Sequence, residues 1–122
     1  MDIVKATISW DGPDHDVLYV FVEPTPKWGV TWDDFPDDEI ISSVAVLREL
    51  DDNDEPIGRV AGIEILDFLR FERWDAMPCL PLLWQVPGSE PLPLVDLLQR
   101  LQAELHGQAR LANVTSRGPR AE

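Results

Sequence analysis

Hydrophobic and polar residues alternate along the first ten positions of the chain. Apolar side chains occupy the even positions of residues 4–10, and polar side chains occupy the odd positions between them. A period of two predicts a strand with one buried face. Residues 11–16 are turn formers, and residues 17–22 are β-branched or aromatic almost throughout, which is typical of a strand covered on both faces. The pattern predicts an antiparallel hairpin over residues 2–22.

Two further strands are predicted over residues 40–50 and 57–65, joined by the polar turn Asp51–Pro56. Gly58 and Gly62 within the second strand indicate a bulge or a close backbone approach. Three prolines interrupt the chain between the first hairpin and these strands. We therefore expect four antiparallel strands arranged as a meander.

The clearest helical pattern lies near the C-terminal end of the chain. Pro93 suits the first helical position, and Gly107 suits the stop. Residues 77–93 carry five prolines and are predicted to be irregular. The apolar stripe has a period of 3.6 residues and consists of Leu94, Leu97, Leu98, Leu101 and Leu105. The predicted fold is α+β, with a four-stranded antiparallel β-meander packed against a C-terminal amphipathic helix. We expect a single domain over residues 1–107 and a flexible tail over residues 108–122.

Charge is distributed unevenly along the 122 residues. The chain carries 23 acidic and 10 basic residues, a net charge of -13, and residues 1–67 hold 17 of the acids but only four of the bases. This balance excludes a conventional nucleic-acid binder, which needs a basic surface, and argues against docking on an anionic membrane. An acidic half attracts a basic protein partner and accelerates the encounter. The alternative is that the acidic surface only keeps the protein in solution.

Enzymatic motifs are absent from the sequence. No zinc-protease, phosphate-binding, nucleophile-elbow or dinucleotide-binding motif is present. Cys79 is the only cysteine, so no intramolecular disulfide can form, and its apolar neighbours do not favour a reactive thiolate. No leader-like pattern or long apolar stretch is present, which favours a cytoplasmic location. We expect a protein that is not an enzyme and uses no cofactor.

Aromatic and acidic residues are interleaved after the first hairpin, a combination that can form a contact surface for a basic protein. Trp28 is the ring predicted to be exposed, whereas Trp32 and Phe35 are predicted to fold back over the core. Asp52 and Asp54 form a second acidic patch. The acids beside the rings that we name as partner-binding are Asp33, Asp34, Asp37 and Asp38.

Two other functions stay open. Glu64, between two isoleucines, is either an outward-facing carboxylate or a buried one that serves a metal-dependent hydrolase. The acidic turn before it is predicted to be solvated and metal-free, because Pro56 replaces the glycine of a calcium-binding loop. The second alternative is a structural homodimer that pairs edge strands or an apolar proline-rich surface formed by Leu80, Leu82, Leu83 and Trp84.

Two segments together resemble the DUF2283 family of small uncharacterised bacterial proteins. Residues 14–20 are similar to its opening D-x-D-x-L-Y-I strand, and residues 51–66 are similar to its acidic turn followed by a hydrophobic-G-I-E-I-L strand. The resemblance covers residues 14–67. The sequence departs from the family pattern at Pro56 and in the C-terminal extension with its helix.

The resemblance implies a small α+β domain of antiparallel strands and no established activity. Some members resemble neighbours of small toxin-like genes, which implies an antitoxin-type role. An acidic protein that neutralises a basic toxin would fit this role.

Overall fold

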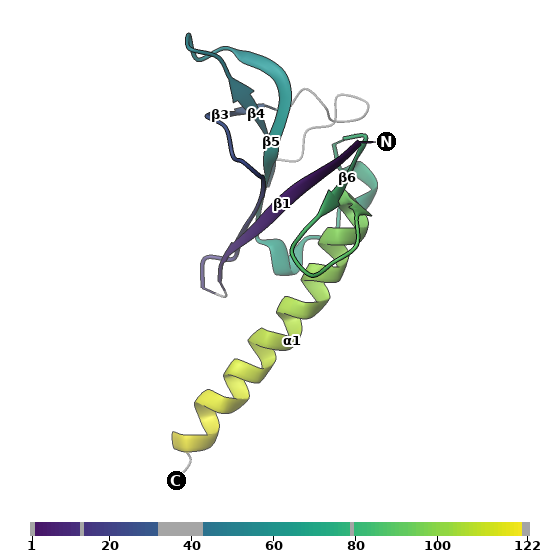
Figure 1. Cartoon of the computed structure of the whole chain (residues 1–122). Coiled ribbons are helices and arrows are strands. Elements are labelled where there is room, and N and C mark those ends of the chain that lie inside the picture. Colours follow the sequence, from purple (N-terminus) through teal and green to yellow (C-terminus); the bar gives the residue numbers. More distant parts are fainter. Residues whose placement is uncertain (1, 13, 32–42, 79, 121–122) are drawn as a thin grey trace.

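The computed structural model describes residues 2–12, 14–31, 43–78 and 80–120. The described strands form one sheet, and the two 3₁₀ helices and the start of the C-terminal helix pack on one of its faces (Figure 1). The strands are β1 (Asp2–Asp11), β2 (Val17–Val22), β3 (Trp28–Thr31), β4 (Val44–Leu50), β5 (Pro56–Leu66), β6 (Leu82–Gln85) and β7 (Leu92–Pro93). The helices are the 3₁₀ helices η2 (Phe68–Arg70) and η3 (Trp74–Ala76) and the α-helix α1 (Leu94–Arg120).

The fold is α+β, but the predicted four-stranded antiparallel meander is wrong. The sheet has seven strands in the order β3-β4-β5-β2-β1-β6-β7, and β1 pairs with β6 in parallel. β5 lies between β2 and β4, so the predicted strands do not follow one another in chain order. The segment expected to be irregular supplies β6 and β7, which have four and two residues. Strands this short give no periodic signal in the sequence.

β1 changes its partner along its length. Residues Asp2–Lys5 pair in parallel with Leu82–Gln85, and residues Ala6–Asp11 pair with β2 in the antiparallel sense. The strand therefore joins the antiparallel part of the sheet to the short β6–β7 hairpin.

The hydrophobic core lies between one face of the sheet and the chain that follows β5. Alternate residues of β2 and β5 face this core, and Trp84 of β6 lies at its centre with no exposed surface. The burial of a large ring in β6 holds the parallel strand against the rest of the fold. The core side chains that are no more than 1% exposed include Leu18, Val20, Ile63, Ile65, Phe68, Trp84, Leu97 and Leu98.

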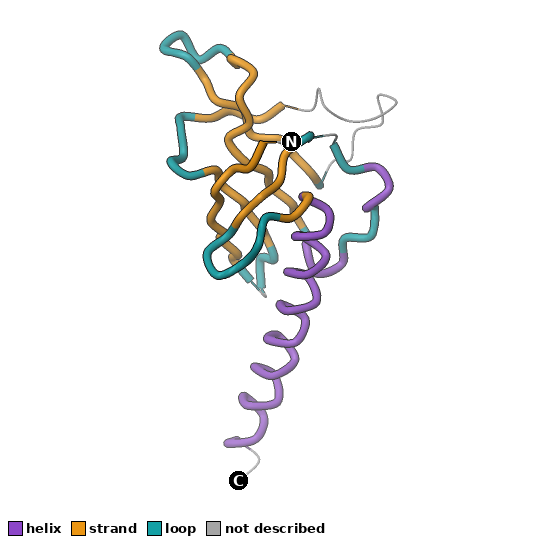
Figure 2. Tube along the Cα trace, turned by 45° about the vertical axis from the view of Figure 1, so that its right-hand side comes forward, coloured by secondary structure: helices purple, strands orange, loops and turns teal. Residues whose placement is uncertain are grey.

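The apolar stripe predicted for the C-terminal helix is confirmed at its first three turns. α1 buries Leu94, Leu97, Leu98 and Leu105 against the core. The helix does not stop at Gly107, as we expected, but continues to Arg120 and extends away from the sheet (Figures 1 and 2). A glycine inside a helix costs about 1 kcal/mol relative to alanine, which does not by itself end a helix. Within the described residues, no helix is long and apolar enough to cross a membrane.

The two glycines of β5 have the roles that the sequence indicated. Gly58 adopts a left-handed φ of 89°, beside register shifts between β4 and β5 that mark an irregularity of the ladder. A Cβ atom built on Gly62 would lie 2.2 Å from the carbonyl oxygen of Val20. The close approach of β2 therefore requires a residue without a side chain at position 62.

Asp16 ties the first hairpin to η2. Its carboxylate accepts a hydrogen bond from the indole Nε1 of Trp10 at 2.9 Å and another from the backbone N–H of Leu69 at 2.8 Å. Its carbonyl oxygen accepts a third from the N–H of Phe68 at 3.2 Å. Asp16 is 9% exposed and has a left-handed φ of 52°, a conformation that aspartate tolerates better than most residues.

Replacement of Asp16 should destabilise the fold strongly. Asp16→Ala removes both side-chain acceptors and places alanine at a positive φ, so we expect the free energy of unfolding to fall by about 2–4 kcal/mol. Asp16→Asn keeps one acceptor and should lose less. Denaturant unfolding measures both changes. Asp14→Ala, at an exposed position of the same turn, is the matched control and should change little. Equal losses for Asp16→Ala and Asp14→Ala would contradict the assignment.

Candidate functional site

The turn between β4 and β5 places Asp52 and Asp54 in solvent. The Oδ1 atom of Asp51 accepts hydrogen bonds from the N–H groups of Asn53 at 2.8 Å and Glu55 at 3.0 Å. These local bonds stabilise the turn, and so the predicted solvated turn is confirmed. Asp52 and Asp54 are exposed at its tip, where they can meet a partner.

The structure brings Trp28 to the same corner of the sheet. Lys27, which precedes Trp28, forms an ion pair with Asp54, and its carbonyl oxygen accepts a hydrogen bond from the N–H of Leu50 at 2.9 Å. Trp28 itself lies opposite Glu49 in the β3–β4 ladder. We call Lys27, Trp28 and the turn Asp51–Glu55 the acidic corner. It unites residues that are more than 20 positions apart in the sequence.

Trp28 is half-buried, so the expectation that it would be exposed is wrong. Its ring packs at 40° to the ring of Phe21, with 6.1 Å between the centroids, and Phe21 stacks on Tyr19 at 5.2 Å. This row of rings lies on the face of the sheet opposite the core, because the alternate residues Leu18, Val20 and Val22 face the core. Packing against Phe21 removes part of the ring of Trp28 from solvent.

Cations also gather around the acidic corner, which the sequence did not predict. Arg59 forms an ion pair with Glu49 at 3.5 Å, and the guanidinium of Arg48 donates a hydrogen bond to the carbonyl oxygen of Gly58. With Lys27, three of the four bases of residues 1–67 lie at this end of the sheet. Lys27 therefore partly offsets the charge of Asp54 at the tip of the hairpin, and Arg59 partly offsets that of Glu49.

The other predicted partner-binding acids cannot be placed. Asp33, Asp34, Asp37 and Asp38, together with Trp32 and Phe35, lie outside the described residues. Cys79 lies outside them as well.

Glu64 lies on the face of the sheet opposite the core, directly across from Tyr19 in the β2–β5 ladder. A hydrogen bond to the Glu64 carboxylate raises the pKa of Tyr19 above its usual value, and partial burial and the negative charge of Glu64 act in the same direction. The described residues contain no group of three histidine, cysteine, aspartate or glutamate side chains placed to hold a metal ion. The contact that the structure gives the Glu64 carboxylate is the hydrogen bond with the phenol of Tyr19.

The titration of Tyr19 tests this contact. A raised pKa means that the fold stabilises the neutral phenol; this contribution is present below the ordinary pKa near 10 and is lost as the pH rises through the folded value. Tyr19 is the only tyrosine, so tyrosinate absorbance reports it alone. Glu64→Gln should shift its pKa back toward the ordinary value, whereas the control Glu55→Gln, in the exposed turn, should not. A wild-type protein that titrates at the ordinary value would refute the contact.

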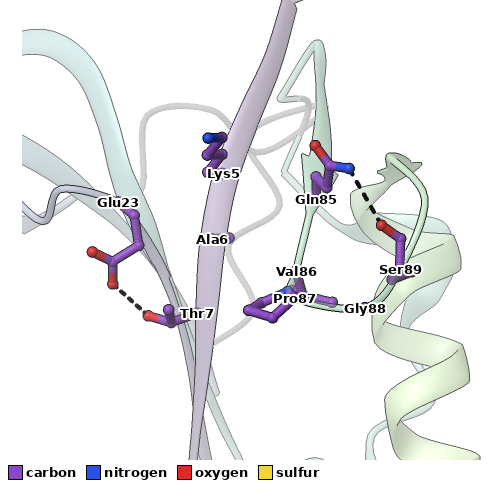
Figure 3. Close-up of a pocket in the computed structure, with 9 residues that line it drawn as sticks. All are labelled: Lys5, Ala6, Thr7, Glu23, Gln85, Val86, Pro87, Gly88 and Ser89. Carbon is purple, nitrogen blue, oxygen red and sulfur yellow. Dashed lines mark hydrogen bonds between the residues drawn. The ribbon is translucent and has the colours of Figure 1, made fainter.

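A cavity of about 650 Å³ opens beside β1 at the point where its partner changes (Figure 3). One wall consists of Lys5, Ala6 and Thr7, and the opposite wall is the chain after β6, Gln85–Ser89. The hydroxyl of Thr7 donates a hydrogen bond to Oε1 of Glu23 at 2.8 Å, which holds this carboxylate at the rim. The sequence offered no signal for the cavity, because its walls meet only through the parallel pairing of β1 and β6.

A second cavity, of about 380 Å³, is lined by both arginines of the first half. Arg48 and Arg59 border it together with the carboxylate-bearing Asp2 and apolar side chains of β1, β2 and β6. Because Arg59 pairs with Glu49 and Arg48 bonds to Gly58, both guanidinium groups have partners within the protein.

One of the four side chains proposed for an apolar homodimer surface is not available to a partner. Trp84 is fully buried in the core, and Leu80, Leu82 and Leu83 are half-buried. Trp84 lies in the core, and Leu80 and Leu82 pack against it, which holds β6 in place.

Comparisons of the chain with protein-family models, with curated proteins and with solved structures give no match. Membership of the DUF2283 family therefore stays a prediction that rests on the two sequence motifs.

Proposed function

We infer that the protein is a non-catalytic binding module that recognises a basic protein partner through its acidic first half. The observation that carries this proposal is the acidic corner. There, Asp52 and Asp54 are exposed at the tip of a hairpin, and Asp54 pairs with Lys27, the residue that precedes the half-buried Trp28. Carboxylates at a projecting tip steer a cationic partner, and a half-buried ring offers it apolar contact area.

The position of the corner supports the same function. The β4–β5 hairpin reaches beyond the neighbouring strands at one end of the sheet (Figure 1), so that a partner can approach it freely. On sequence alone, Asp33, Asp34, Asp37 and Asp38 form the other acidic patch proposed to bind the partner. An antitoxin-type role, as the resemblance implies, would be one form of this function.

Removal of the two exposed charges should weaken binding of a basic peptide. We expect Asp52→Asn/Asp54→Asn to bind a short lysine-rich peptide about three- to tenfold more weakly in calorimetric titration. Binding by the wild type should fall between about 0.1 M and about 1 M salt, because the screening length drops from about 10 Å to about 3 Å.

The matched control removes two exposed charges from the electroneutral half of the chain. Glu90→Gln/Glu104→Gln changes the net charge by the same amount at positions outside the corner, and its affinity should stay close to that of the wild type. Equal losses in the two double variants would show that net charge alone attracts the peptide. A wild-type affinity for the peptide that does not change with salt concentration would overturn the proposal.

A further inference from the structure

The edge of β1 is open beyond the end of β6. β6 pairs with β1 only as far as Lys5 opposite Gln85, and β1 continues to Asp11. Among the described residues, no strand pairs with this side of residues 6–11, although β2 pairs with their other side. An unpaired strand edge presents a row of backbone donors and acceptors to which another chain can bind.

One hydrogen bond defines which backbone groups face this open edge. The N–H of Glu23 donates to the carbonyl oxygen of Lys5 at 2.8 Å, and these residues lie directly opposite each other at the end of the β1–β2 ladder. Hydrogen-bonded and non-hydrogen-bonded pairs alternate along an antiparallel ladder. The backbone groups of Thr7 and Ser9 therefore point to β2, and those of Ile8 and Trp10 point to the open side.

The two faces of the open edge differ in chemistry. Ile8 and Trp10 are half-buried on the core face, where they pack against the hydrophobic core. On the other face, the exposed Asp11 carboxylate is hydrogen-bonded to Nδ1 of His15 at 3.1 Å, and the Glu23 carboxylate accepts a hydrogen bond from Thr7. A strand bound here would place alternate side chains against apolar groups and against carboxylates.

The cavity of Figure 3 makes room for the start of such a strand. After β6 the chain turns away from β1 at Pro87 and Gly88, and Gly88 adopts a left-handed φ of 79°. The space of about 650 Å³ is bordered by Lys5–Thr7, Glu23 and Gln85–Ser89, so it adjoins β1 where the pairing with β6 ends. An incoming strand would occupy the place that β6 leaves.

We propose that the open edge of β1 binds an extended segment of a basic protein, in which apolar residues alternate with lysine or arginine. The proposal rests on the proposed function for the basic character of the partner. Charge complementarity selects this occupant over a second copy of the chain, because two copies would each bring a net charge of -13 and their own Asp11 to the junction. Backbone hydrogen bonds to Ile8 and Trp10 hold the segment, and the alternation of its side chains gives selectivity.

Residue-resolved amide hydrogen exchange tests the proposal on the intact protein. In the free protein the amides of Ile8 and Trp10 should exchange quickly, whereas those of Thr7 and Ser9 are protected by β2. A short peptide of alternating valine and lysine should slow exchange at Ile8 and Trp10 by about tenfold or more. Protection of Ile8 and Trp10 in the free protein would show that the edge is already covered and would overturn the proposal. If that protection grows with protein concentration, the covering segment belongs to a second copy of the chain.

N-methylated peptides provide controls that leave the protein unchanged. Only alternate N–H groups of a strand face its neighbour. Methylation of one alternate set of peptide nitrogens should therefore abolish the protection, and methylation of the other set should not. Equal effects of the two sets would overturn strand addition.

Charge variants separate this proposal from the proposed function. Asp11→Asn/Glu23→Gln should weaken the protection of Ile8, and Asp52→Asn/Asp54→Asn should leave it intact. Salt-dependent peptide binding without protection of Ile8 and Trp10 would refute strand binding at the open edge. It would not contradict binding at the acidic corner. Absence of peptide binding at low salt would refute both.

Discussion

The change of partner along β1 is the constraint on which the rest of the structure depends. In the sheet, β5 lies next to β2, and β6 lies next to β1 on the far side of the β2–β1 pair. The chain must therefore cross over β2 and β1 between β5 and β6. The described residues 67–78 of the crossing segment run over the core face and contribute Phe68, Phe71 and Met77 to the core. The hydrogen bonds of Asp16 to this segment hold its start against the first hairpin. The core, the cavity and the open edge all follow from this arrangement.

The sequence predicted those elements whose residue pattern is visible within the element itself. β1 and the leucine stripe of α1 repeat with the period of their own secondary structure, and β2, β4 and β5 are runs rich in β-branched or apolar residues; the structure contains all of them. β6 is only four residues long and lies between Pro81 and Pro87, so its backbone pairing depends on β1, some 80 positions earlier in the chain. Strand order and parallel pairing depend on such distant contacts, and sequence pattern does not report them.

The same distinction applies to the candidate site. Turn chemistry predicted that Asp52 and Asp54 would be exposed, because aspartate and asparagine form local hydrogen bonds in turns. The neighbourhood of Trp28 was not predictable, because its partner Phe21 lies on β2, which is separated from β3 by two other strands of the sheet. The pairing of Lys27 with Asp54 likewise depends on the packing of β3 beside β4.

The acidity of the first half affects the open edge of β1 in two opposite ways. Many sheet edges are protected from pairing with copies of themselves by charged side chains or by a covering segment. In this protein Asp11 and Glu23 flank the open edge at Ile8 and Trp10, and a second copy would bring the same carboxylates to the same place. Repulsion between like charges opposes self-association there, whereas a cationic strand gains from the same carboxylates. One surface feature thus disfavours an identical chain and favours a basic one, so the edge can stay open without becoming a site of aggregation.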